Sequence, residues 1–485
     1  MRFLETPPSH DLAYSDVFLV PGRSEVVSRL DVSIAPNDGT GASIPIVSSN
    51  MNSVTGSLMA ATIARRGGLG VLPQDLPLQE LDAAIRWIKE QPVDWHSPIT
   101  LAAERPVRDA LSRVPVAAGH GVVIVDAEGA FAGSIDASEL AVAHPDARLG
   151  DLLCGAAHPS PGHPGIDADD VTDARTAFDL MVAADSEFVP VLRHGAVVGT
   201  LSRTSALRST IYAPHVDGDR RLAVAAAVGI NGDLEAKARA LVAAGVDVLV
   251  LDTAHGHQER MIRAIDTVAK LGLGVPVVAG NVVTPEAVRD FADAGANIIK
   301  VGVGPGAMCT TRMMTAVGRP QFSAVLDTAA AAAEAGVAVW ADGGVRYPRD
   351  VALALAAGAA SVMVGSWFAG TVESPGDMVQ DADGRLYKES WGMASTKAVR
   401  ERFERLDPYE LARRTLFAEG ISSSKIYLDP LRPSVEDLLD MITSGLRSSL
   451  SYAGAHDLAE FAEKSVVGVQ SAAGYEEGKA LPVSW

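Results

Sequence analysis

The sequence contains very little cysteine and no long apolar run, and it lacks an excess of positive charge. Its two cysteines, Cys154 and Cys309, exclude a disulfide framework and indicate a reducing compartment. The formal net charge of −19 argues against nucleic acid or an anionic membrane as a partner. No apolar run approaches the roughly 18 residues of a membrane span, and the first residues contain no apolar signal core. We therefore expect a cytoplasmic protein without a membrane partner.

Aromatic residues are also scarce, at 5% of the chain, whereas alanine and glycine are plentiful. This composition is typical of a helix-rich α/β protein. Two early stretches, 44–51 and 68–72, are predicted buried strands, each followed by a helical stretch (56–66 and 78–89). Six further predicted strands occupy residues 222–228, 246–252, 275–279, 296–301, 337–341 and 361–364. Helical patterns between them cover residues 234–244, 258–271, 285–294, 321–335 and 349–357.

Two strands before the middle of the chain and six after it make eight strand–helix units. Eight such units predict a TIM (β/α)8 barrel, with a doubly wound sheet as the alternative. The barrel is expected to comprise residues 1–92 and 215–485. Residues 371–433 are long, irregular and charged, and we predict that they form a flap with a helix over 398–416. Residues 14–21 are predicted to be a further short strand, and 434–449 and 455–464 two final helices.

The strand–helix alternation stops between residues 93 and 214. Segments 121–136 and 188–202 each read as two short strands around a turn, and each follows a helical stretch (107–113 and 174–184). A linker rich in proline and glycine separates the two copies. We therefore predict a repeated α+β module inserted after the second strand–helix unit.

One glycine-rich stretch leads directly to a cysteine. It follows a predicted strand and contains Gly302, Gly304 and Gly306, then Cys309 and Arg312. Glycine allows the backbone to approach a ligand closely. Exposed N–H groups and a neighbouring cation are what a thiolate needs, so Cys309 is a candidate nucleophile. The alternative is a buried structural cysteine in a turn.

Other polar motifs also follow predicted strands, at the face where TIM barrels place their active sites. They are S-S-N-M (48–51), D-T-A-H-G-H (252–257), A-G-N-V-V-T (279–284), A-D-G-G (341–344) and V-G-S (364–366). The glycines of the last two motifs are predicted to bind a phosphate, and Asp342 to accept from ribose hydroxyls. Asp252 is a candidate contact for a second ligand. His255 and His257 lack a third metal ligand, so we favour a loop pair over a metal site.

Together these motifs resemble the inosine-monophosphate dehydrogenase/guanosine-monophosphate reductase family, over residues 10–475. The motifs G-V-G-P-G-A-M-C-T-T-R (302–312) and S-G-L-R-S-S-L-S-Y-A-G-A (444–455) contribute most to this resemblance. The insertion at 93–214 resembles a pair of cystathionine-β-synthase-type (CBS) modules. This resemblance implies regulatory purine nucleotides, ATP or GTP, at the modules. It also implies a homotetramer, or an octamer formed through the modules.

The resemblance further implies roles for individual residues. Cys309 would attack C2 of a purine nucleoside monophosphate and form a covalent thioimidate. Carbonyl groups of Gly304, Gly306 and Cys309 would hold a monovalent cation such as K+. The residues expected to bind the substrate are Ser49, Met51, Asp342, Gly343, Gly344, Gly365, Ser366, Tyr387, Gly392 and Met393. Those expected to bind the cofactor are Asp252, Thr253, Ala254, Asn281 and Gly302.

Two activities in this family share the thioimidate and differ in its fate. A reductase expels ammonia from guanosine monophosphate (GMP) with a Thr–Glu pair, here Thr311 and Glu419, and takes hydride from NADPH. A dehydrogenase transfers hydride from inosine monophosphate (IMP) to NAD, and then activates water with an Arg–Tyr pair. The nearest match to that pair is Arg402-Phe403, and phenylalanine cannot share a proton.

We therefore predict a GMP reductase. The first alternative is an IMP dehydrogenase, which the D-T-A-H-G-H motif and the inserted module resemble. The second alternative is a catalytically weak sensor of purine nucleotides. Two departures from the family pattern concern binding: Ala307 replaces a serine that contacts phosphate, and Leu72-Pro73-Gln74 replaces a segment that contains a lysine near the nicotinamide.

Overall fold

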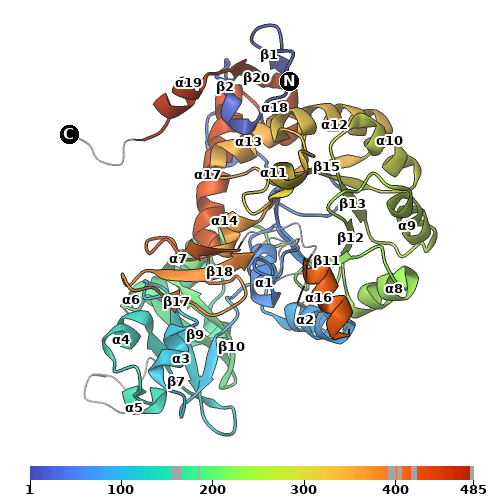
Figure 1. The fold of residues 1–485 in the computed structure, drawn as a ribbon. Coiled ribbons are helices and arrows are strands. Elements are labelled where there is room, and N and C mark those ends of the chain that lie inside the picture. The colour runs from blue at the N-terminus through green and yellow to red at the C-terminus, as the bar shows by residue number, and fades with distance from the viewer. Residues whose placement is uncertain (154–164, 184, 392–399, 401–406, 417–422, 481–485) are drawn as a thin grey trace.

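The computed structural model describes residues 1–153, 165–183, 185–391, 400, 407–416 and 423–480. A barrel surrounded by helices forms the larger part of the molecule, and the inserted segment lies beside it (Figure 1). In the part of the chain that the structure describes, no helix is both long enough and apolar enough to span a membrane.

Eight parallel strands close into a barrel, in the order β11-β12-β13-β14-β15-β16-β3-β4. Their bounds are β3 Ile46–Ser48, β4 Leu69–Leu72, β11 Ala225–Val228, β12 Val248–Asp252, β13 Val277–Val282, β14 Ile298–Val301, β15 Ala338–Asp342 and β16 Ser361–Val364. Closure confirms the predicted TIM barrel and excludes the doubly wound sheet, which would have two open edges.

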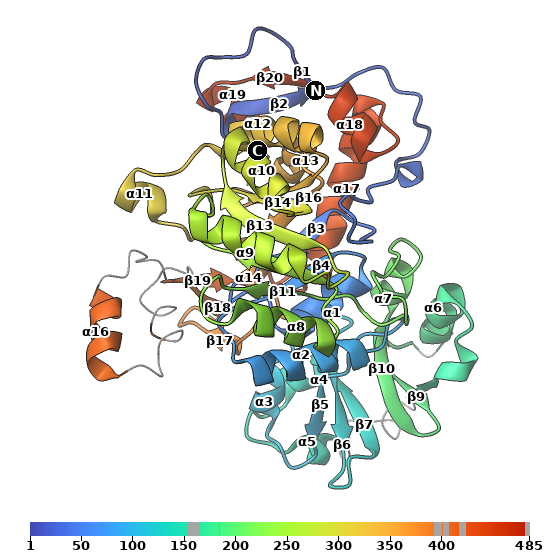
Figure 2. The same cartoon turned by 90° about the vertical axis from the view of Figure 1, so that its right-hand side faces the viewer.

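Helices cover the outside of the barrel (Figures 1 and 2). They are α1 Ser57–Arg65, α2 Leu78–Glu90, α8 Leu234–Ala244, α9 Glu259–Lys270, α10 Pro285–Asp293, α12 Gln321–Ala335, α13 Pro348–Ala356 and α17 Val435–Ala453. The shorter α11 Thr311–Thr315 and α14 Ser366–Ala369 follow β14 and β16, and α18 Leu458–Lys464 and α19 Ala472–Glu477 come near the end of the chain.

Side chains alternate between the inside of the barrel and the helical layer, because successive residues of a strand face opposite sides. On β15, Trp340 is fully buried with the barrel interior cluster, whereas Val339 and Ala341 pack in the outer cluster with the helices. Asp342 ends this strand on the same face as Trp340. The strand therefore places the Asp342 carboxylate inside the mouth of the barrel.

The inserted segment consists of two small sheets with the same topology. The first contains β5 Thr100–Ala102, β6 Gly121–Val125 and β7 Phe131–Asp136, with α3 Val107–Leu111, α4 Ala137–Val142 and α5 Leu149–Leu153. The second contains β8 Ile166–Asp167, β9 Phe188–Arg193 and β10 Ala196–Ser202, with α6 Ala174–Ala183 and α7 Arg203–Arg208. Each sheet has one parallel and one antiparallel pairing, and each has its own apolar core.

The region predicted as an irregular flap contains a sheet that we did not predict. Strands β17 Val379–Gln380, β18 Leu386–Trp391 and β19 Ser423–Tyr427 pair antiparallel. The helix predicted over 398–416 is also wrong as one element. Asp407 lies outside α16 Pro408–Leu416, and its carboxylate accepts from the N–H groups of Tyr409 and Glu410. Proline disfavours helical backbone at the residue that precedes it. Asp407 precedes Pro408, which explains why the helix is broken there.

Strands from near the two ends of the described chain meet in a fourth small sheet. Strand β20 Val466–Val469 lies between β1 Arg2–Phe3 and β2 Val17–Val20. The stretch 14–21, which we predicted to be a strand throughout, begins with a short 3-10 helix at Tyr14–Asp16.

Candidate active site

A buried ammonium group lies between two carboxylates at the mouth of the barrel. Lys300 Nζ is 2.7 Å from Asp252 Oδ1 and 2.7 Å from Asp342 Oδ2, and only 3% of the Lys300 side chain is exposed. The three residues come from β12, β14 and β15, and each occupies an inward-facing position near the end of its strand. The alternation of side chains therefore brings these charges together.

The two carboxylates decide the charge of Lys300. Burial alone would lower the pKa of its ammonium group, because a buried charge loses its hydration. Asp252 and Asp342 outweigh burial and raise the pKa above its ordinary value. Lys300 is therefore a permanent cation in the neutral range of pH.

Two asparagines extend this cluster. Asn50 donates from Nδ2 to Asp252 Oδ2 at 2.9 Å, and Asn281 donates to Asp342 Oδ2 at 2.9 Å and to the Gly302 carbonyl at 2.6 Å. Oδ1 of Asn281 is buried, and no donor reaches it from the described residues. A buried acceptor of this kind is expected to bind a ligand donor or water.

Cys309 is exposed in the loop between β14 and α11, so the alternative of a buried structural cysteine is wrong. Its Sγ lies 3.2 Å from Thr311 Oγ1, and its N–H donates to the Gly306 carbonyl at 3.0 Å. Gly304 has a φ of +81°, and a Cβ there would lie 2.3 Å from Cγ of Arg312. Glycine at 304 thus lets the Arg312 side chain pack onto the loop that presents the thiol.

The predicted phosphate-binding glycines lie against the cysteine loop. A Cβ on Gly343, whose φ is +94°, would meet Pro305 Cγ at 3.1 Å and Gly306 N at 3.2 Å. A Cβ on Gly344 would meet Pro305 Cβ at 3.4 Å. The structure therefore brings the loop after β15 into contact with the loop after β14.

A second group of predicted substrate residues meets where β16 and β3 end. A Cβ on Gly365 would lie 3.3 Å from Ser49 Oγ and 3.4 Å from Met51 Sδ. Ser49 Oγ is buried and finds no hydrogen-bond partner in the described chain. Ser366 begins α14 next to Gly365.

The remaining predicted residues lie apart from these two groups or outside the described chain. Thr253 exchanges backbone hydrogen bonds with Gly280 and Asn281, both at 2.9 Å, so the loop that contains Thr253 and Ala254 is attached to the end of β13. His257 pairs with Asp290 at 2.8 Å. Tyr387 lies on β18, where its ring packs edge-on against Tyr427 at 5.9 Å between centroids. The predicted residues that lie outside the described chain are Gly392, Met393, Arg402, Phe403 and Glu419.

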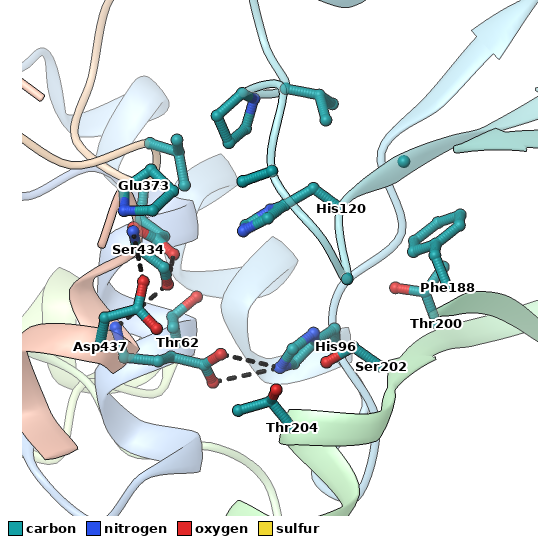
Figure 3. A pocket seen from close by; sticks show the side chains of 18 of the residues that line it. Thr62, His96, His120, Phe188, Thr200, Ser202, Thr204, Glu373, Ser434 and Asp437 are labelled. Carbon is teal, nitrogen blue, oxygen red and sulfur yellow. Dashed lines mark hydrogen bonds and ion pairs between the residues drawn. The ribbon is translucent and has the colours of Figure 1, made fainter. Parts of the chain in front are cut away.

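A cavity of about 480 Å³ lies where the inserted segment meets the barrel (Figure 3). His96, His120, Thr200 and Ser202 line it from the inserted segment, and Glu373 lines it from the barrel side. Burial raises the pKa of Glu373 to about 7, although its carboxylate accepts from Ser434 Oγ and the Val435 N–H. Burial lowers the pKa of His120 to about 4.

Buried ion pairs fix this junction. Arg208, at the end of α7, donates to Glu436, Asp437 and Asp440 in the first turns of α17, at 3.1, 2.5 and 2.8 Å. Arg66 donates to Glu436 at 2.7 Å. Burial alone would raise the pKa of Glu436, but the neighbouring cations hold it well below its ordinary range. These ion pairs could not be predicted from the sequence, because no local pattern links residue 208 to residue 436.

Comparisons with known proteins place this arrangement in a family. The family model described as "IMP dehydrogenase / GMP reductase domain" matches residues 11–480. A GMP reductase of Mycobacterium tuberculosis is 52% identical over the full length of both chains. An inosine-5'-monophosphate dehydrogenase of Staphylococcus aureus is 34% identical and covers 94% of this chain and 92% of its own.

A solved structure agrees with these sequence relatives. The crystal structure of a cysteine-to-alanine variant of GMP reductase from Trypanosoma brucei, in complex with guanosine 5'-monophosphate, covers 99% of both chains. Its TM-score is 0.68 and its sequence identity is 30%. The chain therefore belongs to the IMP dehydrogenase / GMP reductase family.

Proposed function

We propose that this protein is a GMP reductase that converts GMP, NADPH and protons to IMP, NADP and ammonia. The observation that carries the proposal is the exposed Cys309 beside Thr311, at the mouth of a barrel whose full-length relatives include GMP reductase. The 34% identity with an IMP dehydrogenase keeps that enzyme as the second candidate.

Cys309 and Thr311 perform the first half of the proposed reaction. The thiolate of Cys309 forms a bond to C2 of the guanine ring, and the amino group at C2 leaves as ammonia. Thr311 Oγ1, 3.2 Å from the sulfur, is positioned to pass a proton to that leaving group, with Glu419 as its partner. The bound nicotinamide supplies the hydride that replaces sulfur at C2.

The charged cluster and the glycine loops would hold the two ligands. Asp342 uses Oδ2 for Lys300 and Asn281. No hydrogen bond from the described residues reaches its Oδ1, which would accept from ribose hydroxyls. Backbone N–H groups of the loops at 343–344 and 365–366 would hold the phosphate. The cofactor would contact Asp252, Thr253, Ala254, Asn281 and Gly302. The buried Oδ1 of Asn281, which no donor reaches from the described residues, would accept from an N–H or O–H group of a bound ligand.

A monovalent cation such as K+ fits the cysteine loop chemically. Its ligands would be the carbonyl oxygens of Gly304, Gly306 and Cys309. The Gly306 carbonyl already accepts one hydrogen bond from the Cys309 N–H, and a carbonyl has a second lone pair for a cation.

Two assays test the proposed reaction. Purified protein is incubated with GMP and NADPH, and separately with IMP and NAD. We expect NADPH to disappear in the first mixture and no NADH to form in the second. NADH formation without NADPH loss would identify a dehydrogenase. If neither nucleotide pair reacts but nucleotides still raise the melting temperature, the protein is a sensor.

We further propose that residues 93–214 are a tandem pair of CBS modules that bind ATP or GTP and adjust the rate. The matching topology of the two small sheets supports this identification. Residues of both modules and of α17 line the cavity in Figure 3. A nucleotide bound there would therefore contact both the modules and the barrel domain. We also propose that the protein assembles into a homotetramer or octamer and that it is cytoplasmic.

Arg208 offers a test of this regulation. Arg208→Ala removes the cation that links α7 to three carboxylates of α17, so we expect ATP or GTP to change the rate much less than in the wild type. The rate is measured with and without each nucleotide. Arg175→Ala is the matched control, because Arg175 is 83% exposed and pairs within its own helix. Equal nucleotide responses in wild type and Arg208→Ala would contradict the proposed coupling.

A further inference from the structure

A glutamine with a buried acceptor atom lies at the mouth of the barrel, between β4 and β11. Gln74 follows the end of β4 by two residues, and a Cβ on Gly229, just after β11, would lie 2.9 Å from Gln74 Oε1. Lys237, in the first turns of α8, donates from Nζ to the Gln74 carbonyl at 3.0 Å. The side chain and the main chain of Gln74 are thus both held toward β11.

The Oε1 atom of Gln74 is buried, and the described part of the chain provides no donor for it. A buried acceptor without a donor loses its hydration and gains no hydrogen bond in return, which is unfavourable in free energy. A ligand that donates a hydrogen bond to Gln74 Oε1 would therefore bind favourably. A glutamine side chain presents one acceptor and one N–H2 donor side by side. This pattern is complementary to a primary carboxamide, which presents the same two groups in reverse.

The position of Gln74 in the barrel favours the cofactor over the nucleotide substrate. Strand β11 pairs with β4 on one side and with β12 on the other, and β12 ends in Asp252. The loop after β14, which presents Cys309, lies on the far side of the barrel from β4. A nicotinamide that faced the purine from the side of β11 and β12 would bring its carboxamide to Gln74.

We propose that the side-chain amide of Gln74 pairs with the carboxamide of the nicotinamide, and that Lys237 is a positioning residue that holds the turn at 73–75. This inference rests on the proposed function and assigns a subsite within it. Burial lowers the pKa of Lys237, which agrees with an ammonium group enclosed beside the site.

A modified cofactor separates this pairing from a general structural role. The probe is the acetylpyridine analogue of NADPH, in which a methyl group replaces the carboxamide nitrogen. Binding of NADPH and of this analogue is measured by titration calorimetry without GMP, so that no reaction takes place during the titration. We expect the wild type to prefer NADPH by about tenfold or more, because the analogue lacks the donor for Gln74 Oε1.

Gln74→Leu should bind both cofactors about equally, within roughly twofold, because it has no acceptor to satisfy. Lys237→Met should reduce the preference, and Lys237→Arg should restore part of it. Arg239→Ala is the control, since Arg239 is exposed on the same helix and pairs with Glu235. Affinity for GMP should stay unchanged in Gln74→Leu.

An unchanged preference for NADPH in Gln74→Leu would overturn the inference. A loss of GMP affinity in that variant, with the preference intact, would assign Gln74 to the purine instead. Because binding is measured directly, these results do not depend on turnover. Failure of the proposed reaction would appear separately, as the absence of NADPH oxidation in the wild type.

Discussion

Cys309→Ala is expected to lower the rate of NADPH oxidation with GMP by roughly a thousandfold or more, because the variant cannot form the bond to C2. Removing a nucleophile costs far more than removing a binding contact. The thiol is exposed, so its loss opens no cavity in the core, and the melting temperature should change little. The measurement is the initial rate, followed by NADPH absorbance, with the melting curve as a check on folding.

Met313→Ala is the matched control for this experiment. Met313 lies in α11, four residues from Cys309, and is 89% exposed. Its replacement should keep most of the activity. If Cys309→Ala retained turnover comparable with Met313→Ala, the covalent mechanism would be refuted, whatever the overall reaction.

Lys300→Met is expected to destabilise the folded protein by roughly 3 to 5 kcal/mol, because it leaves two carboxylates close together without their cation. Lys300 is the buried cation between Asp252 and Asp342, and both distances are 2.7 Å. The free energy of unfolding is measured by denaturant titration at neutral pH. Activity should fall as well, since both carboxylates belong to the proposed ligand sites.

Lys270→Met provides the comparison for Lys300. Lys270 is 74% exposed and pairs with Asp266 one turn away on the same helix. Exposed pairs of this kind contribute little, so the free energy of unfolding should change by less than about 0.5 kcal/mol. Similar losses in the two variants would mean that the cluster at the barrel mouth has no special role in stability.

The barrel could be predicted from the sequence because its signals are local. Each strand is a short apolar run and each outer helix has a 3.6-residue pattern, and several helices end at glycine with positive φ, as at Gly245 and Gly336. Predicted strand ends also put Cys309, Gly343 and Gly365 at the same end of the barrel, where we predict the active site. Their contacts with neighbouring loops agree with that location.

The features that the sequence analysis missed depend on contacts between distant residues. Lys300 lies in an apolar strand, which indicates a buried charge. Its two partners could not be predicted, because Asp252 and Asp342 lie 48 and 42 residues away along the chain. The sheet of β17, β18 and β19 was missed because β17 has only two residues and because β19 begins more than 30 residues after the end of β18. Asp407-Pro408 was a local signal for a break in the predicted flap helix. We gave more weight to the helical pattern of residues 398–416 and missed the break.

The most direct test of the proposed reaction follows the nitrogen atom that GMP loses. GMP labelled with a heavy nitrogen isotope at the amino group on C2 is incubated with NADPH and the wild-type protein. We expect one IMP and one labelled ammonia for each NADPH oxidised, and neither product with Cys309→Ala. The proposed reaction would be contradicted if the label stayed in the nucleotide while NADPH was consumed, or if the protein formed NADH from IMP and NAD but released no ammonia from GMP.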